Sequence, residues 1–138
     1  MHALEVIGTH PEVRNVPVHG VDALAACVEA CLDCAQTCIA CADACLGEDG
    51  VEDLRRCIRL NLDCATLCAA AGEIASRRTH PNLALLKHVL EVCIEACRIC
   101  ALECTRHAGH HEHCHICQNA CEACEQACRR AIESAGLN

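Results

Sequence analysis

From residue 22 onward, apolar residues recur every three or four positions, and nowhere do they alternate with polar residues as in a strand. This period predicts amphipathic helices. Helix-capping residues and helix breakers divide the pattern into four segments, at about 22–46, 50–77, 81–108 and 111–135. Because short connections join long helices, we predict an all-α fold, an antiparallel up-down-up-down four-helix bundle.

Residues 1–21 lack a sustained period and contain Pro11 and Pro17. We therefore expect a short N-terminal arm, with at most one short helix, ahead of a bundle domain over residues 22–138. A chain of 138 residues suits one compact domain, and no second domain is expected.

Cysteine is the most unusual part of the composition. Eighteen of the 138 residues are Cys, whereas Phe, Tyr and Trp are absent. Aromatic side chains normally supply much of the buried area of a core. Sulfur must therefore fill part of this interior, and we expect the bundle to have a Cys-lined core.

Dense cysteine indicates either a secreted disulfide scaffold or an intracellular thiol or metal site. The N-terminus has no basic segment, and Glu5 interrupts its short apolar stretch, so we expect no signal peptide and a cytoplasmic protein. No uninterrupted apolar run approaches the roughly 18 residues of a membrane span, so we expect no membrane partner. Eleven Lys and Arg against nineteen Asp and Glu, without a basic cluster, argue against nucleic acid as a partner.

The cysteines of each predicted helix follow one another at spacings that place them on a single face, the face that meets the other helices. Asn61 occupies the one slot that interrupts the series in the second helix. The candidate metal ligands of this series are Cys27, Cys31, Cys34, Cys38, Cys41, Cys45, Cys57, Cys64, Cys68, Cys93, Cys97, Cys100, Cys104, Cys114, Cys117, Cys121, Cys124 and Cys128.

Opposite positions in two antiparallel helices have residue numbers with a constant sum. Both predicted hairpins obey this rule, with Cys27 opposite Cys68 in the first and Cys93 opposite Cys128 in the second. If the two hairpins also align, these four cysteines form the first of a stack of layers. The fifth layer then holds Cys41, Leu54, His107 and Cys114, and Cys45 lies beyond it.

The two ends of this stack differ. Apolar side chains are expected to close one end, namely Leu24, Ile74, Leu86, Leu90 and Ile132. Five histidines gather at the other end, namely His107, His110, His111, His113 and His115. We expect His107, His111 and His113 to be metal ligands of an entry mouth, because His107 continues the cysteine register and His111 follows it by four residues. The roles of His110 and His115 stay open, and Asn61 is either a weak oxygen ligand or a hydrogen-bonded core residue.

A core lined by cysteine is underfilled unless something occupies it, and soft thiolates suit Cu(I), Zn(II) or iron–sulfur clusters. Disulfides fit poorly, because cysteines four apart on one helix project in parallel and the cytoplasm is reducing. Zn(II) on four thiolates leaves excess negative charge in every layer, whereas one Cu(I) per thiolate leaves none. Iron–sulfur sites usually take cysteines from loops. We therefore predict multiple Cu(I) ions per chain, approaching one per cysteine.

High capacity predicts storage and detoxification of cytosolic Cu(I), with release to a copper chaperone and no catalysis. Two alternatives stay open. One is a zinc-stabilised structural bundle, which would unfold without metal. The other is a thiol redox enzyme, which would use a reactive cysteine pair with His107 near Cys104 and Cys114.

The motif C-x3-C-x2-C-x3-C-x2-C-x3-C over 27–45, the matching runs in the third and fourth helices and the histidine-rich turn 107–115 resemble the cytosolic copper storage proteins of bacteria. The resemblance covers about 22–135. It implies Cu(I) bound to the cysteines, metal entry at the histidine end and a homotetramer.

Overall fold

The computed structural model describes residues 1–137, except the side chains of residues 18 and 19, and residue 138 of the predicted bundle lies outside it. Within this range there is no strand, so the all-α prediction is confirmed. The helices are α1 (Ala3–Gly8), α2 (Val18–Leu46), α3 (Arg55–Ser76), α4 (Leu83–Thr105) and α5 (Glu112–Ser134), with short 3-10 helices η1 (Val13–Asn15) and η2 (Val51–Leu54).

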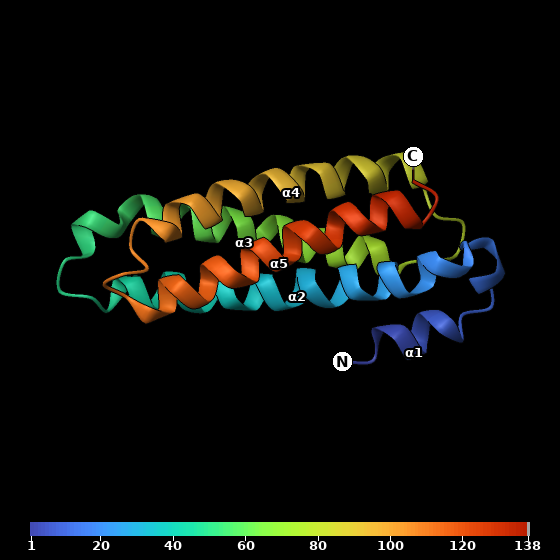
Figure 1. The fold of residues 1–138 in the computed structure, drawn as a ribbon, viewed down its shortest axis with the longest axis horizontal. Helices are drawn as coiled ribbons and strands as arrows, with labels where there is room; N and C mark the ends of the chain where they lie inside the picture. The colour runs from blue at the N-terminus through green and yellow to red at the C-terminus, as the bar shows by residue number, and fades with distance from the viewer. Residues whose placement is uncertain (138) are drawn as a thin grey trace.

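The four long helices run side by side, and each is antiparallel to the next one in the chain (Figure 1). Helix α2 packs against α3 and α5, and α4 packs against the same two helices, so the bundle closes on itself. The predicted up-down-up-down arrangement is therefore present. The α2–α3 and α4–α5 connections lie at one end of the bundle, and the α3–α4 connection lies at the other end.

Helix α2 begins at Val18, ahead of the predicted start at Asp22. Pro17 precedes it with φ −53° and ψ 144°, and so ends the extended chain of the arm. The first turn packs closely on the end of α5, since a Cβ built at Gly20 would lie 2.8 Å from Ala135 Cα. This tertiary contact extends the helix into the segment that the sequence assigned to the arm.

The other helix ends also differ from the sequence prediction. The segment predicted to open the second helix tightens into η2, which places Leu54 in the core at 1% exposure. Helix α4 begins later than predicted because the side chain of Asn82 caps it, accepting a hydrogen bond from the Leu85 backbone N at 3.0 Å. Thr105 and Ser134 end α4 and α5, slightly before the predicted positions.

The N-terminal arm lies along the outside of α2, below the bundle in Figure 1. Ile7 of α1 is buried and belongs to the same apolar cluster as the bundle core. Beyond α1, His10 Nε2 lies 3.4 Å from Thr79 Oγ1, and Glu12 accepts a hydrogen bond of 3.4 Å from the His80 backbone N. The arm thus reaches the α3–α4 connection.

Helix α2 is more apolar than its interrupted sequence pattern indicates. Its segment Gly20–Leu46 has a mean hydropathy of 1.5 and the length of a membrane span. Half of this apolar window is buried inside the bundle, because cysteine and alanine face the other helices. A core helix of a bundle meets the same criterion of length and composition.

Candidate metal centre

All eighteen cysteines lie in the interior of the bundle as free thiols. Cys41 is 2% exposed and every other cysteine is 0% exposed. Because the three- and four-residue spacing keeps each series on one helical face, the four helices together build one column of sulfur along the bundle axis.

The two hairpins align as expected. Across the α2–α5 seam the sulfur–sulfur distances within predicted layers are 3.8 Å for Cys27–Cys128, 3.8 Å for Cys31–Cys124, 3.7 Å for Cys34–Cys121, 3.6 Å for Cys38–Cys117 and 4.0 Å for Cys41–Cys114. Across the α3–α4 seam, Cys68 lies 3.6 Å from Cys93, and Cys64 lies 3.9 Å from Cys97. One register therefore holds along the whole column.

The layers are also joined to one another, because equally short distances connect neighbouring layers. Cys31 lies 3.6 Å from Cys128, and Cys68 lies 3.6 Å from Cys97. Side chains tilt toward the N-terminus of their own helix, so antiparallel neighbours tilt in opposite directions and their sulfurs interleave. The column is one connected sulfur network.

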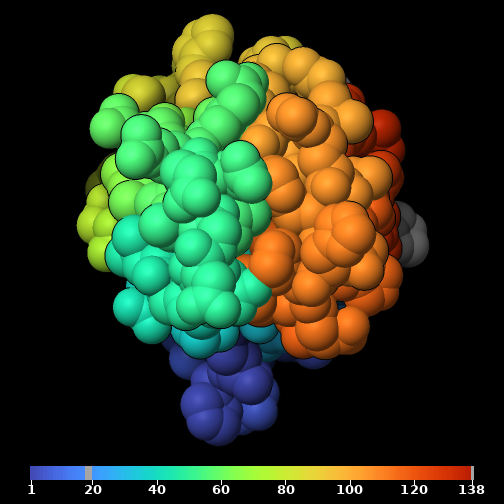
Figure 2. Space-filling model, turned by 90° about the vertical axis from the view of Figure 1, so that its left-hand side faces the viewer, coloured from blue at the N-terminus to red at the C-terminus, as the bar shows by residue number. Residues whose placement is uncertain are grey.

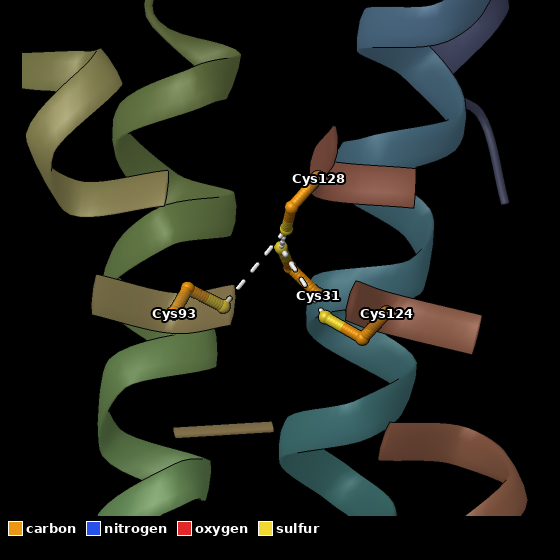
Figure 3. Close-up of side chains that lie close together, drawn as sticks. All are labelled: Cys31, Cys93, Cys124 and Cys128. Carbon is orange, nitrogen blue, oxygen red and sulfur yellow. Dashed lines mark hydrogen bonds between the residues drawn. The ribbon is translucent and has the colours of Figure 1, made fainter. Parts of the chain in front are cut away.

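Quartets of sulfur atoms within 4.8 Å of one another repeat along this network. In the quartet of Figure 3, Cys31 comes from α2, Cys93 from α4, and Cys124 and Cys128 from α5, and their side chains converge. Cys124 also belongs to the next quartet, which adds Cys34. Shared members of this kind suit metal ions joined by bridging thiolates.

Asn61 interrupts the sulfur column and is 0% exposed. Its Nδ2 donates to the Cys57 backbone O at 2.8 Å, and its Oδ1 accepts from the thiols of Cys117 at 2.8 Å and Cys100 at 3.4 Å. Both ends of the amide are therefore satisfied. Of the two roles that the sequence left open for Asn61, these bonds favour that of a hydrogen-bonded core residue over that of a metal ligand.

At the histidine end, His113 reaches into the column. Its Nδ1 lies 3.4 Å from Cys41 Sγ and 3.6 Å from Cys114 Sγ. These two cysteines form a quartet with Cys45 and Cys57, so Cys45 belongs to the same sulfur network. His113 Nε2 is buried without a hydrogen-bond partner among the described residues.

The other mouth histidines contact carboxylates. His107 Nε2 lies 3.2 Å from Glu103 Oε1, and His111 Nδ1 pairs with Glu48. The rings of His111 and His113 stack with centroids 5.5 Å apart. His107, His111 and His113 are thus partly covered at this end, where the α2–α3 and α4–α5 connections abut (Figure 2).

His110 and His115, by contrast, are exposed, and within the described residues neither side chain is hydrogen-bonded to a cysteine. The sequence analysis did not identify Glu48 and Glu103 as part of the site. Glu103 could have been found, because it precedes His107 by one helical turn. No local signal marks Glu48, since its partner lies in a distant connection.

The environment shifts the pKa values of the thiols in this last quartet. Burial raises the pKa of Cys45 to about 11, and burial also raises the pKa of Cys114. The neighbouring thiols, Cys104 and Cys41 above all, lower the pKa of Cys57. Metal entering this quartet must therefore displace protons from protonated thiols.

The donor set limits the metals that the column can hold. Thiolate and imidazole donors are soft or borderline ligands, which select Cu(I) or Zn(II) over Mg(II) and Ca(II). A monovalent ion per thiolate leaves a buried network neutral, whereas divalent ions on four thiolates each leave net charge in the core. Because the sulfur quartets share members along the whole column, this excess charge would accumulate with divalent ions, and the network favours the monovalent ion.

Comparison with known proteins gives a direct result. The family model described as copper storage protein matches residues 21–133, most of the chain and all four long helices. The chain belongs to the copper storage protein family. Comparison with curated protein sequences gives no significant match.

Three solved structures resemble this member of the family. One is the copper storage protein Ccsp from Streptomyces lividans loaded with 10 copper equivalents, with a TM-score of 0.90 and 43% identity, covering 96% of this chain and 98% of that chain. A second is a cytosolic copper storage protein from Streptomyces lividans with five coppers. It has a TM-score of 0.81 and 49% identity, covering 83% of this chain and 96% of that chain. The third is the Cu(I)-bound copper storage protein BsCsp3, with a TM-score of 0.68 and 36% identity, covering 80% of this chain and 96% of that chain.

Proposed function

We propose that this protein binds and stores Cu(I) at high capacity and so detoxifies it. The observation that carries this function is the single network of eighteen free, buried thiols. Sulfurs 3.6 to 4.0 Å apart leave room for ions bridged between them. One Cu(I) per thiolate neutralises the core, which an uncompensated row of thiolates could not tolerate.

The proposed ligands are all eighteen cysteines, with His107, His111 and His113 at the entry. His113 is the inner member of the entry, because its Nδ1 faces two thiols, whereas His107 and His111 contact the carboxylates of Glu103 and Glu48. Asn61 holds neighbouring thiols through hydrogen bonds and takes no copper of its own. The solved structures of relatives with copper bound support this assignment.

Storage requires no catalysis, and we propose none. We also propose that the protein acts in the cytosol, as the Streptomyces lividans relative is described, and that it releases copper to a chaperone or to small thiols. A homotetramer is the proposed assembly. It is supported by exposed apolar side chains on the outer faces of the helices, among them Ile39, Leu62, Val92, Leu102 and Ile116.

The decisive experiment is an anaerobic titration of the reduced, metal-free protein with Cu(I) against a chromophoric chelator. Protein is quantified by its thiols, because the chain has no aromatic residues. We expect many ions to bind, on the scale of the eighteen cysteines. Saturation after one or two ions would contradict storage.

The same preparation separates the two alternatives. A zinc-stabilised bundle would lose its helical circular dichroism when metal is removed, whereas we expect the metal-free protein to stay folded. A thiol redox enzyme would turn over peroxide without metal and would lose this activity on mutation of one cysteine pair. We expect no such turnover.

A further inference from the structure

Glu103 is a charged side chain buried at the mouth of the sulfur column. Its side chain is only 7% exposed, and both carboxylate oxygens have partners. Oε2 lies 3.3 Å from Arg106 Nη1 and 3.5 Å from Arg56 Nε, whereas Oε1 lies 3.2 Å from His107 Nε2. The two arginines come from α3 and from the end of α4, so they hold the carboxylate from two sides.

The contact with Glu103 determines which nitrogen of His107 can bind metal. When Nε2 carries the proton and donates it to Oε1, the lone pair of the neutral ring lies on Nδ1. The ring is only 15% exposed, so it has little freedom to turn away from the column. His107 lies three residues beyond Cys104, the last cysteine of α4, and its backbone N donates a hydrogen bond to the Cys104 backbone O at 3.0 Å.

We propose that Glu103 is a positioning residue for copper entry: it fixes the ring of His107 so that Nδ1 is presented to incoming Cu(I) beside the outermost thiols. The inference rests on the proposed storage function. Metal-binding histidines commonly donate their second N–H to a carboxylate, and removal of that carboxylate weakens metal binding about 10- to 100-fold. Here the effect should fall on the rate of entry, because the eighteen thiols that set capacity stay intact.

A pair of substitutions separates positioning from simple stabilisation. Glu103→Leu removes the charge and the acceptor, whereas Glu103→Gln removes the charge but keeps an acceptor oxygen for His107. Both lose the ion pairs with Arg56 and Arg106, so both should lower the free energy of unfolding similarly. Only Glu103→Leu should slow the initial uptake of Cu(I) from a chromophoric Cu(I)–chelator complex, by about 10-fold or more.

Two controls complete the test. Glu95→Leu removes a carboxylate from the same helix, one that is paired with Arg98 in the same i,i+3 geometry but is exposed and distant from the mouth, and it should leave the uptake rate unchanged. In a His107→Ala background, Glu103→Leu should cause no further slowing. Equal slowing by Glu103→Gln and Glu103→Leu, or further slowing in the His107→Ala background, would overturn the proposal.

The capacity of the variants keeps this test separate from the proposed function. Wild type and all variants should reach the same final number of Cu(I) ions, and only the rate should differ. If wild type itself takes up one or two ions, storage fails. If wild type takes up many ions and Glu103→Leu fills at the wild-type rate, storage stands and the role of Glu103 fails.

Discussion

The two ends of the sulfur column are built on the same four helices and differ in almost every other respect. At the α3–α4 end, Leu24, Leu86 and Leu90 are at most 1% exposed and fill the bundle with hydrocarbon. At the opposite end, His107 and His113 are 15% and 26% exposed and contact carboxylates or thiols. The apolar packing that stabilises the fold therefore lies at one end of the bundle axis, and the groups that admit metal lie at the other.

This separation leads us to expect that a core rich in small thiols stays folded without metal. The leucine end provides well-packed apolar area, and the N-terminal arm adds Ile7 to the same cluster. The histidine end is free to carry polar and charged side chains, because it contributes less to the hydrophobic stabilisation. Substitutions at the two ends should therefore have different consequences.

The largest effect on stability should come from the leucine end. Leu90→Ala removes a fully buried side chain and should lower the free energy of unfolding by about 2–5 kcal/mol, because it leaves a cavity. Urea unfolding of metal-free protein, followed by far-UV circular dichroism, measures it. Leu85→Ala is the matched control on the same helix at 49% exposure, and it should change stability by less than about 0.5 kcal/mol. Equal losses would mean that burial of Leu90 adds no stability.

High pH should weaken the metal-free protein through the histidine end. The pKa of Cys45 rises from 9.0 to about 11 on folding, so its contribution to stability is full below pH 9.0 and is lost as the pH rises toward 11. The pKa of Cys114 is also raised on folding. The urea midpoint of reduced, metal-free protein should therefore fall across this range, and Cys45→Ala should reduce the fall. A midpoint that stays constant or rises would contradict the shift.

An intermediate effect is expected from the middle of the column. Asn61→Leu removes the amide that holds Cys100 and Cys117 and should cost about 1 kcal/mol of unfolding free energy. The anaerobic Cu(I) titration should give the wild-type capacity, because the thiols remain. A reproducible loss of one bound ion would instead make Asn61 Oδ1 a copper ligand.

The smallest effect should come from the exposed histidines. His110→Ala should change the initial rate of Cu(I) uptake by less than about twofold, whereas His113→Ala should slow it clearly, because His113 contacts two thiols and His110 is exposed. Stopped-flow transfer from a Cu(I)–chelator complex measures both. Comparable slowing by His110→Ala would mean that the entry extends over the whole histidine-rich turn.

The sequence predicted the four helices, their antiparallel order and the common register, because the cysteine spacing is itself a helical period. It could not predict the interleaving of neighbouring layers, which arises from the opposite tilt of side chains in antiparallel helices. It also missed the early start of α2 at Val18, since close packing of Gly20 on the end of α5 is a tertiary effect. Glu48 was missed because its contact with His111 joins two separate connections.

The common register of the four helices also limits how such a protein can evolve. Insertion of one residue in a helix would rotate every later cysteine by about 100° away from the axis. Insertion of seven residues preserves the face but displaces that helix by about 10 Å relative to its neighbours. The column can therefore lengthen or shorten without loss of register only when all four helices change together by whole heptads, so its length is expected to vary among such bundles in discrete steps.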